Sequence, residues 1–228
     1  MLLASFAVFA VLLIYLPSFW VRRVMHFYSK DDCDIRGTGA ELAQHLIDRF
    51  QLDGIAVEEC PPLGDHFDPR GQAVRLSPQN YRGKSLTAVA VAAHEVGHAI
   101  QFFRKERIFQ LRSKYLPVAS ALNRCGILIM WLIPIAGIFL RAPGALAIMI
   151  ALSLLLQLGG AMAHLIILPE EWDASFSKAL PILIEGEYIK HADIPAVRRI
   201  LKAAALTYFS AALVNVLNLS RWLILFRR

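Results

Sequence analysis

Residues 89–101 have the sequence VAVAAHEVGHAIQ. Ser85 stands where an N-cap is expected, and no proline or glycine interrupts the apolar run from Leu86 to Ala93 that follows it. The sequence therefore predicts an α-helix here. On that helix His94 and His98 are four residues apart and lie on the same face.

Two imidazoles on one face of a helix can bind the same tetrahedral metal ion, and zinc is the ion that such a pair most often holds. Glu95 follows the first histidine, where it can accept a proton from water whose pKa the cation lowers toward ~7. The pattern predicts hydrolysis of an amide bond. The alternative at this point is a pair of surface histidines beside an exposed glutamate.

Gly97 lies inside the predicted helix, between the two histidines. A glycine in a helix interior costs about 1 kcal/mol relative to alanine. We therefore expect a compensating reason for it, namely that another segment of the chain packs closely beside the metal.

A catalytic zinc site usually has three protein ligands and one open position, so a third ligand is expected elsewhere. Residues 168–175, LPEEWDAS, contain the adjacent carboxylates Glu170 and Glu171. Pro169 is predicted to end the preceding segment and to let a new helix begin. Either glutamate can be the ligand or an ordinary first-turn acid, and Asp173 can orient a ligating histidine through its second ring nitrogen.

Five stretches of the chain together form a recognisable set: Phe67-Asp68-Pro69-Arg70, Val74-Arg75-Leu76-Ser77, Asn80-Tyr81, residues 92–101 and residues 168–175. They resemble the YugP-type family of membrane-bound neutral zinc metallopeptidases. The resemblance implies a zinc-dependent endopeptidase with a single zinc ion. It also implies Glu171 as the third ligand, because residues 171–174 match a Glu-x-x-Ala pattern of such enzymes, and Glu170 becomes an alternative.

The composition indicates a membrane protein, because 57% of the 228 residues are hydrophobic and the mean hydropathy is +0.49. The run at residues 2–21 is long enough to cross ~30 Å of hydrocarbon, and the basic pair Arg22-Arg23 after it favours an uncleaved anchor over a secretory signal. Residues 119–140 and 145–168 form a predicted helical hairpin around a Pro-Gly turn. A fourth run, residues 203–226, contains several polar residues; spanning is the favoured prediction, and the alternative is a helix along the interface or against the other helices.

The predicted fold is mainly α: a helical zincin-like catalytic domain with a small β element, plus about four transmembrane helices. The predicted parts are an anchor at 1–21, a zincin-like part with the HExxH helix at 22–118, the membrane hairpin at 119–168, a helix carrying the third ligand at 169–202, and a C-terminal membrane helix at 203–228.

Basic residues concentrate between the first two apolar runs, near their membrane ends, whereas the hairpin turn offers only Arg141. The protein is expected in a bacterial-type plasma membrane, and the positive-inside rule places residues 22–118 and 169–202 on its cytoplasmic side. These basic flanks account for the net charge of +6, so a nucleic-acid partner is not needed to explain it. The expected partners are a peptide substrate, the lipid bilayer and membrane-protein regulators. The basic residues are Arg22, Arg23, Lys30, Arg104, Lys105, Arg107, Arg112 and Lys114.

The three cysteines, Cys33, Cys60 and Cys125, lack the paired spacing of metal knuckles or redox motifs. We predict free thiols.

The polar segment between the first apolar run and the helix with His94 and His98, here called the metal helix, is predicted to contain a helix at 38–50 and extended stretches at 55–58 and 73–77. In the second stretch, Val74 and Leu76 alternate with Arg75 and Ser77, as in a half-buried strand. We expect residues Ala73 to Ser77 to form an edge strand to which a substrate peptide adds by main-chain hydrogen bonds. The alternative is an ordinary hairpin that covers the metal helix.

The favoured function is a membrane-anchored zinc endopeptidase. A second hypothesis is an intramembrane protease of the site-2 type, in which residues 86–103 would span and Leu52-Asp53-Gly54 would be a site tripeptide. The order of these segments disfavours it, because the tripeptide precedes the metal helix in polar surroundings. A third hypothesis is a catalytically silent membrane scaffold that contains zinc.

Overall fold

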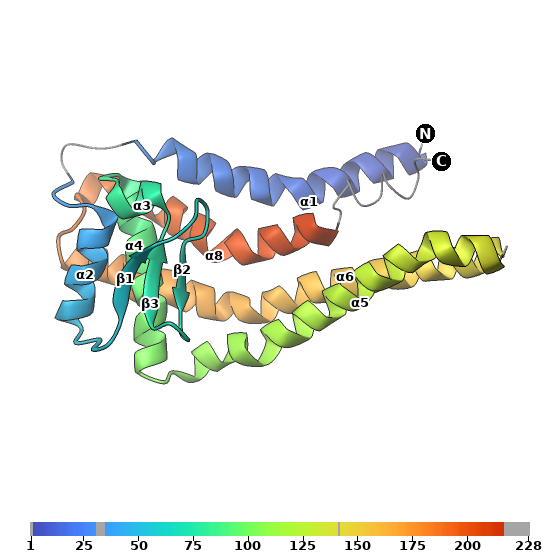
Figure 1. Ribbon diagram of the computed structural model, residues 1–228. Helices are drawn as coiled ribbons and strands as arrows, with labels where there is room; N and C mark the ends of the chain where they lie inside the picture. The colour runs from blue at the N-terminus through green and yellow to red at the C-terminus, as the bar shows by residue number, and fades with distance from the viewer. Residues whose placement is uncertain (1, 31–34, 141, 217–228) are drawn as a thin grey trace. The chain divides into compact units, whose positions relative to one another are not determined.

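The structure is a computed structural model that describes residues 2–30, 35–140 and 142–216 (Figure 1). The described residues are mostly helical and include one three-stranded sheet. The chain forms two compact units. The helical unit comprises residues up to Phe19, Leu111–Leu168 and the chain from Thr207 onward, and the mixed unit comprises Trp20–Gln110 and Pro169–Leu206.

The predicted hairpin is present in the helical unit as α5 (Gln110–Leu140) and α6 (Pro143–Trp172). Both helices extend beyond the predicted apolar runs, and α6 begins at Pro143, where the fixed φ of proline suits the first helical position. Glycines allow the two backbones to approach closely. A Cβ on Gly126 would lie 2.8 Å from the Ser153 carbonyl oxygen, and one on Gly160 would lie 2.8 Å from the Ala119 carbonyl oxygen.

Two helices among the described residues are long and apolar enough to cross a membrane, one within Arg107–Phe139 and one within Pro143–Glu185. Large apolar side chains are exposed along them, among them Leu128, Trp131 and Leu155. The first predicted span lies in α1 (Leu2–Phe27), which is helical. The fourth begins in α8 (Ile194–Val216), and its residues 217–226 lie outside the described part of the chain, so four spans remain a prediction.

The predicted short helix at 38–50 is confirmed as α2 (Gly39–Arg49). Its start is fixed by a capping box, in which the Thr38 hydroxyl accepts from the Glu41 N–H and the Glu41 carboxylate accepts from the Thr38 N–H. The apolar face of α2, including Leu46, is buried in the core of the mixed unit.

The sheet consists of β1 (Ala56–Glu59), β2 (His66–Asp68) and β3 (Ala73–Leu76), in the order β1-β3-β2. β1 pairs with β3 in parallel, and β2 pairs with β3 antiparallel, with Phe67 opposite Val74. The two predicted extended stretches are therefore strands, but β2 was not predicted. Its three residues are too few for a recognisable alternation.

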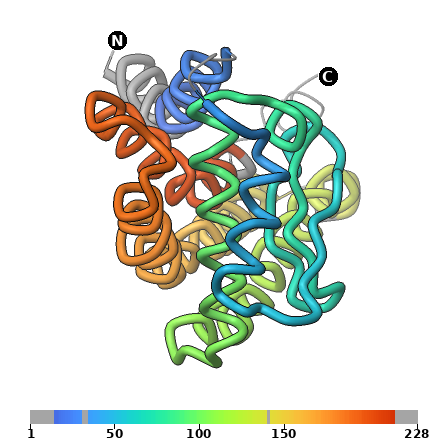
Figure 2. The backbone as a smooth tube through the Cα atoms, turned by 90° about the vertical axis from the view of Figure 1, so that its left-hand side faces the viewer, coloured from blue at the N-terminus to red at the C-terminus, as the bar shows by residue number. Residues whose placement is uncertain are grey.

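The short helix α3 (Pro78–Arg82) leads into the metal helix α4 (Leu86–Phe103). The predicted N-cap is confirmed, because the Ser85 hydroxyl accepts from the Ala88 N–H at 3.1 Å. Every residue of α4 from Thr87 to Gln101 is buried. α4 packs against α2, the sheet and the segment that follows α6, so it is the central helix of the mixed unit (Figures 1 and 2).

The prediction that Pro169 ends a helix is wrong. α6 continues through Pro169 to Trp172 and passes into the π-helix Asp173–Ala179, which is followed by α7 (Leu180–Glu185). An interior proline removes one intrahelical hydrogen bond and its ring crowds the carbonyl four residues earlier. Packing of the following π-helix against α4, with Ala174 fully buried, offsets this local cost. Single-turn 3₁₀ helices at Arg107–Phe109 and His191–Asp193 complete the described elements. Cys60 and Cys125 are free thiols, and Cys33 lies outside the described residues.

Candidate metal centre

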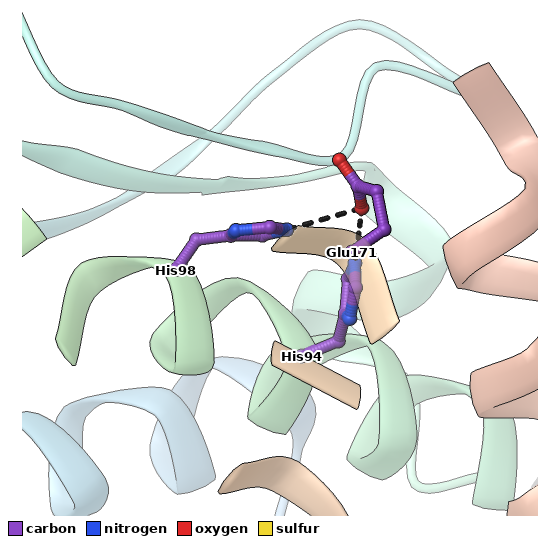
Figure 3. A group of neighbouring side chains, drawn as sticks. All are labelled: His94, His98 and Glu171. Carbon is purple, nitrogen blue, oxygen red and sulfur yellow. Dashed lines mark hydrogen bonds and ion pairs between the residues drawn. The ribbon is translucent and has the colours of Figure 1, made fainter. Parts of the chain in front are cut away.

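Three buried side chains converge at one point in the mixed unit (Figure 3). His94 and His98 extend from α4, and Glu171 extends from the C-terminal end of α6. The Glu171 Oε2 atom lies 3.3 Å from His94 Nε2 and 3.2 Å from His98 Nε2. One ligand atom from each of the three residues lies within 4.8 Å of the others. The structure thus brings together the three residues predicted to hold the metal.

The hydrogen bonds of Gln101 determine which nitrogen of His98 carries the proton. The Gln101 Nε2 group donates to the Glu170 carbonyl oxygen at 3.1 Å and to Asp173 Oδ2 at 2.8 Å, and neither of these atoms can donate. The other amide atom, Oε1, therefore faces His98 Nδ1 at 2.9 Å as an acceptor. His98 must donate through Nδ1, which leaves the Nε2 lone pair directed at Glu171.

Ser175 determines the proton position on His94 in the same way. The Ser175 hydroxyl donates its single proton to the Leu201 carbonyl oxygen at 3.1 Å. It can then only accept at the 3.0 Å contact with His94 Nδ1. His94 therefore also carries its proton on Nδ1 and presents the Nε2 lone pair to Glu171.

This donor arrangement fits a zinc ion. Two nitrogen lone pairs facing one carboxylate oxygen in a buried site are mutually unfavourable unless a positive charge lies among them. Zinc–ligand bonds of about 2.0–2.1 Å in tetrahedral geometry place two ligand atoms roughly 3.3–3.4 Å apart. The Nε2–Oε2 distances of 3.3 and 3.2 Å match that separation. Both Nδ1 atoms are held by outer partners, as is usual for histidine ligands of zinc.

The close packing expected at Gly97 is confirmed. A Cβ added to Gly97 would lie 2.7 Å from the Ala174 carbonyl oxygen, closer than real Cβ atoms approach backbone. Ala174 is fully buried in the π-helix that follows Glu171. The missing side chain at Gly97 therefore lets the segment that carries Glu171 lie directly against α4.

Replacing Gly97 with alanine should destabilise the protein, although helix propensity alone favours alanine by about 1 kcal/mol. Overpacking against a backbone carbonyl typically costs about 1–3 kcal/mol, and this outweighs the propensity gain. The measurement is thermal unfolding of the detergent-solubilised protein. Gly144→Ala is the matched control, because nothing lies within 4 Å of a Cβ there, and it should keep or raise the melting temperature. A Gly97→Ala variant as stable as the control would contradict this packing.

Glu95, the predicted proton acceptor, is buried on α4 with 7% of its surface exposed. Its surroundings are reflected in the thiol of Cys60, which follows β1. Burial raises the pKa of Cys60, and the negative charges of Asp65 and Glu95 raise it further. Glu95 therefore lies near the start of the loop that connects β1 to β2.

Glu170 and Asp173, predicted as outer partners or alternative ligands, both lie beside the three converging residues. The fully buried Glu170 has Oε1 3.7 Å from His98 Nδ1, on the ring edge opposite Nε2. Asp173 was expected to orient a histidine directly. Instead it accepts from Gln101, which in turn accepts from His98, so that Asp173 acts through an intervening amide.

The expectation that Ala73 to Ser77 form an edge strand is wrong. Residues Ala73–Leu76 are β3, the middle strand, and hydrogen bonds to β1 and β2 occupy both of its sides. Ser77 follows the strand, where its N–H and hydroxyl both bond Asp65. A substrate peptide has no free edge on β3, because a three-residue strand that the sequence pattern did not reveal occupies that side.

The sequence interpretation missed Gln101 and Ser175 as partners of the histidines. Gln101 is three residues after His98, on the same helical face, so the helix spacing alone could have suggested it. Ser175 is four residues after Glu171, but its link to His94 and Leu201 depends on three separate segments meeting.

A sequence model of the family described as "Putative neutral zinc metallopeptidase" matches residues 3–227. The chain belongs to this family. It is also similar to a Bacillus subtilis (strain 168) protein named "Putative membrane protease YugP", with 36% identity over 214 residues that cover 92% of this chain and 91% of that protein. No solved structure matches the chain.

Proposed function

We propose that this chain is a membrane-anchored, zinc-dependent endopeptidase with a zincin-like catalytic unit. In this proposal His94, His98 and Glu171 hold one zinc ion. One observation carries this proposal: the Nε2 atoms of both histidines face one carboxylate oxygen of Glu171, while both ring protons are held on Nδ1. The family and the two long apolar helices support a protease associated with a membrane.

When bound, zinc acts as a Lewis acid and lowers the pKa of water toward ~7. Glu95 accepts the proton of the attacking water at its carboxylate and then delivers it to the nitrogen of the departing amine. The buried surroundings of Glu95 limit competition from bulk water for this proton. Gln101 and Ser175 hold the two imidazoles so that their Nε2 atoms stay directed at the metal position.

Removal of the metal tests this function. Dialysis against a chelator should abolish cleavage of an unfolded, casein-like substrate, and added zinc should restore it, because the hydrolytic water depends on the ion. Metal analysis should find one zinc per chain. If zinc is present but no chelator-sensitive cleavage of any unfolded substrate occurs, the chain is a silent scaffold and the proposed function is wrong.

We also propose that the mixed unit faces the cytoplasm. The basic residues near the membrane ends support this orientation through the positive-inside rule. Arg104 is exposed near the end of α4, and Ala142 is exposed between the two hairpin helices.

Single cysteines at these two positions test the orientation. In a background without the natural cysteines, Arg104→Cys should react only with a reagent that enters the cytoplasm, whereas Ala142→Cys should react from outside the cell. Labelling of both from the same side would contradict a spanning hairpin. Labelling of Arg104→Cys from outside would reverse the orientation.

The intramembrane hypothesis receives no support from the mixed unit. α4 is surrounded by protein along its length, and Leu52-Asp53-Gly54 lies in the turn between α2 and β1. Gly54 has a φ of +84°, which suits a surface turn.

A further inference from the structure

Gln101 is a fully buried amide that makes three hydrogen bonds, all to groups around the candidate metal centre. A buried amide is costly unless its polar atoms are bonded. Here the two Nε2 hydrogens bond Glu170 and Asp173, and Oε1 bonds His98. The amide is therefore held in one orientation by His98 on α4 and by Glu170 and Asp173 on the segment opposite α4.

A charged chain extends outward from this amide. The Asp173 carboxylate that accepts from Gln101 also forms an ion pair with Lys178, one turn further along the π-helix. Lys178 Nζ in turn contacts Glu106 Oε2 at 2.8 Å, in the segment that follows α4. Only 11% of the Lys178 side chain is exposed, so solvent screens this network weakly. The network joins both ends of the segment from Gln101 to Glu106 to the π-helix.

The orientation of the amide has a chemical consequence for His98. If the amide were reversed, its NH₂ group would face Nδ1, and the ring would have to accept there and carry its proton on Nε2. A histidine protonated on Nε2 cannot use that nitrogen as a metal ligand. The Asp173 carboxylate prevents this reversal, because it would then face the amide oxygen.

We propose that Gln101 is a positioning residue that selects the metal-binding tautomer of His98. Asp173 and Lys178 contribute to zinc binding indirectly, because they fix the orientation of the Gln101 amide. This inference rests on the proposed function, since it assumes that zinc binds His98.

The test is zinc affinity, measured by competition with a chromophoric chelator on the full-length protein in detergent. Gln101→Met keeps the size of the side chain and removes its hydrogen bonds, and it should weaken zinc binding about 10–100-fold. The cobalt-substituted form should also show an altered visible spectrum. Gln44→Met is the matched control. Gln44 is exposed on α2, where it donates to Asp48 on the same helix, so this change should leave both readouts unchanged.

A charge-swapped pair separates orientation from packing. In Gln101→Glu, the new carboxylate can still accept from His98 but faces the Asp173 carboxylate without a donor, so zinc binding should weaken. Adding Asp173→Asn supplies an amide donor to the new carboxylate and should recover at least about tenfold of the lost affinity, within the range for outer partners of zinc ligands.

The outcomes distinguish this inference from the proposed function. If wild-type protein binds no zinc, both are wrong. If wild type binds zinc and Gln101→Met binds it within about threefold, below the 10–100-fold expected of such partners, only the role of Gln101 is overturned. The role is also overturned if the double variant binds no better than Gln101→Glu. Should Gln101→Met fail to fold, the comparison of Gln101→Glu with the double variant still decides.

Discussion

Replacing Glu95 with glutamine is expected to lower the rate of peptide cleavage about 10²–10⁴-fold, the contribution typical of a positioned general base. Glutamine has nearly the same size as glutamate, but its amide cannot accept a proton from water. Because Glu95 is not among the three converging side chains, zinc should stay bound. The substitution therefore separates proton transfer from metal binding.

The measurement is the cleavage rate of an unfolded substrate together with the zinc content of the same preparation. Glu185→Gln is the control, because Glu185 is exposed at the end of α7 and should tolerate the same change without loss of rate. If Glu95→Gln cut the substrate as fast as wild type, Glu95 would not be the general base. If it lost both zinc and activity, its role would be structural.

The elements that the sequence predicted best are those specified by local interactions. The N-caps at Thr38 and Ser85 are each formed by a side chain and a backbone N–H three residues away, so the sequence alone contains the signal. β2 and the helix through Pro169 lack such a signal for different reasons. β2 pairs with the nearby strand β3, but its three residues are too few to show an alternation. The helix through Pro169 is followed by a π-helix that packs against α4, a partner distant in sequence, and this packing overrides the local preference of proline.

The same distinction applies to the candidate metal centre. His94 and His98 face one direction because of helix geometry, which follows directly from their spacing. Glu171 is 73 residues away from His98, and the adjacent Glu170 has the same chemistry, so the residues alone could not choose between them. The family resemblance selected Glu171, and the geometry agrees with that selection, since its carboxylate faces both Nε2 atoms.

The three buried carboxyl groups at this centre also favour a bound cation. Glu95, Glu170 and Glu171 are each at most 7% exposed. Buried carboxylates are strongly unfavourable unless they are protonated, paired or bound to metal. Zinc would compensate the carboxylate that faces the two neutral imidazoles. Removal of that carboxylate should therefore affect metal binding far more than removal of its neighbour.

Glu171→Gln is expected to weaken zinc binding by more than about 100-fold, beyond the 10–100-fold typical of outer partners of zinc ligands. A neutral amide oxygen is a poor substitute for a carboxylate that faces two histidines. The adjacent variant Glu170→Gln is the matched comparison, because Glu170 is equally buried but lies near the Nδ1 edge of His98. It should weaken binding at most by the range given for outer partners.

Thermal unfolding in the presence of zinc provides a second measurement of this pair. A ligand that binds only the folded state at about 1,000 times its Kd stabilises that state by about 4 kcal/mol. Added zinc should therefore raise the melting temperature of wild type and Glu170→Gln, while Glu171→Gln should show little change at the same concentration. If Glu170→Gln lost the zinc-dependent shift and Glu171→Gln kept it, the third ligand would be Glu170, and the assignment of Glu171 Oε2 as a ligand atom would be wrong.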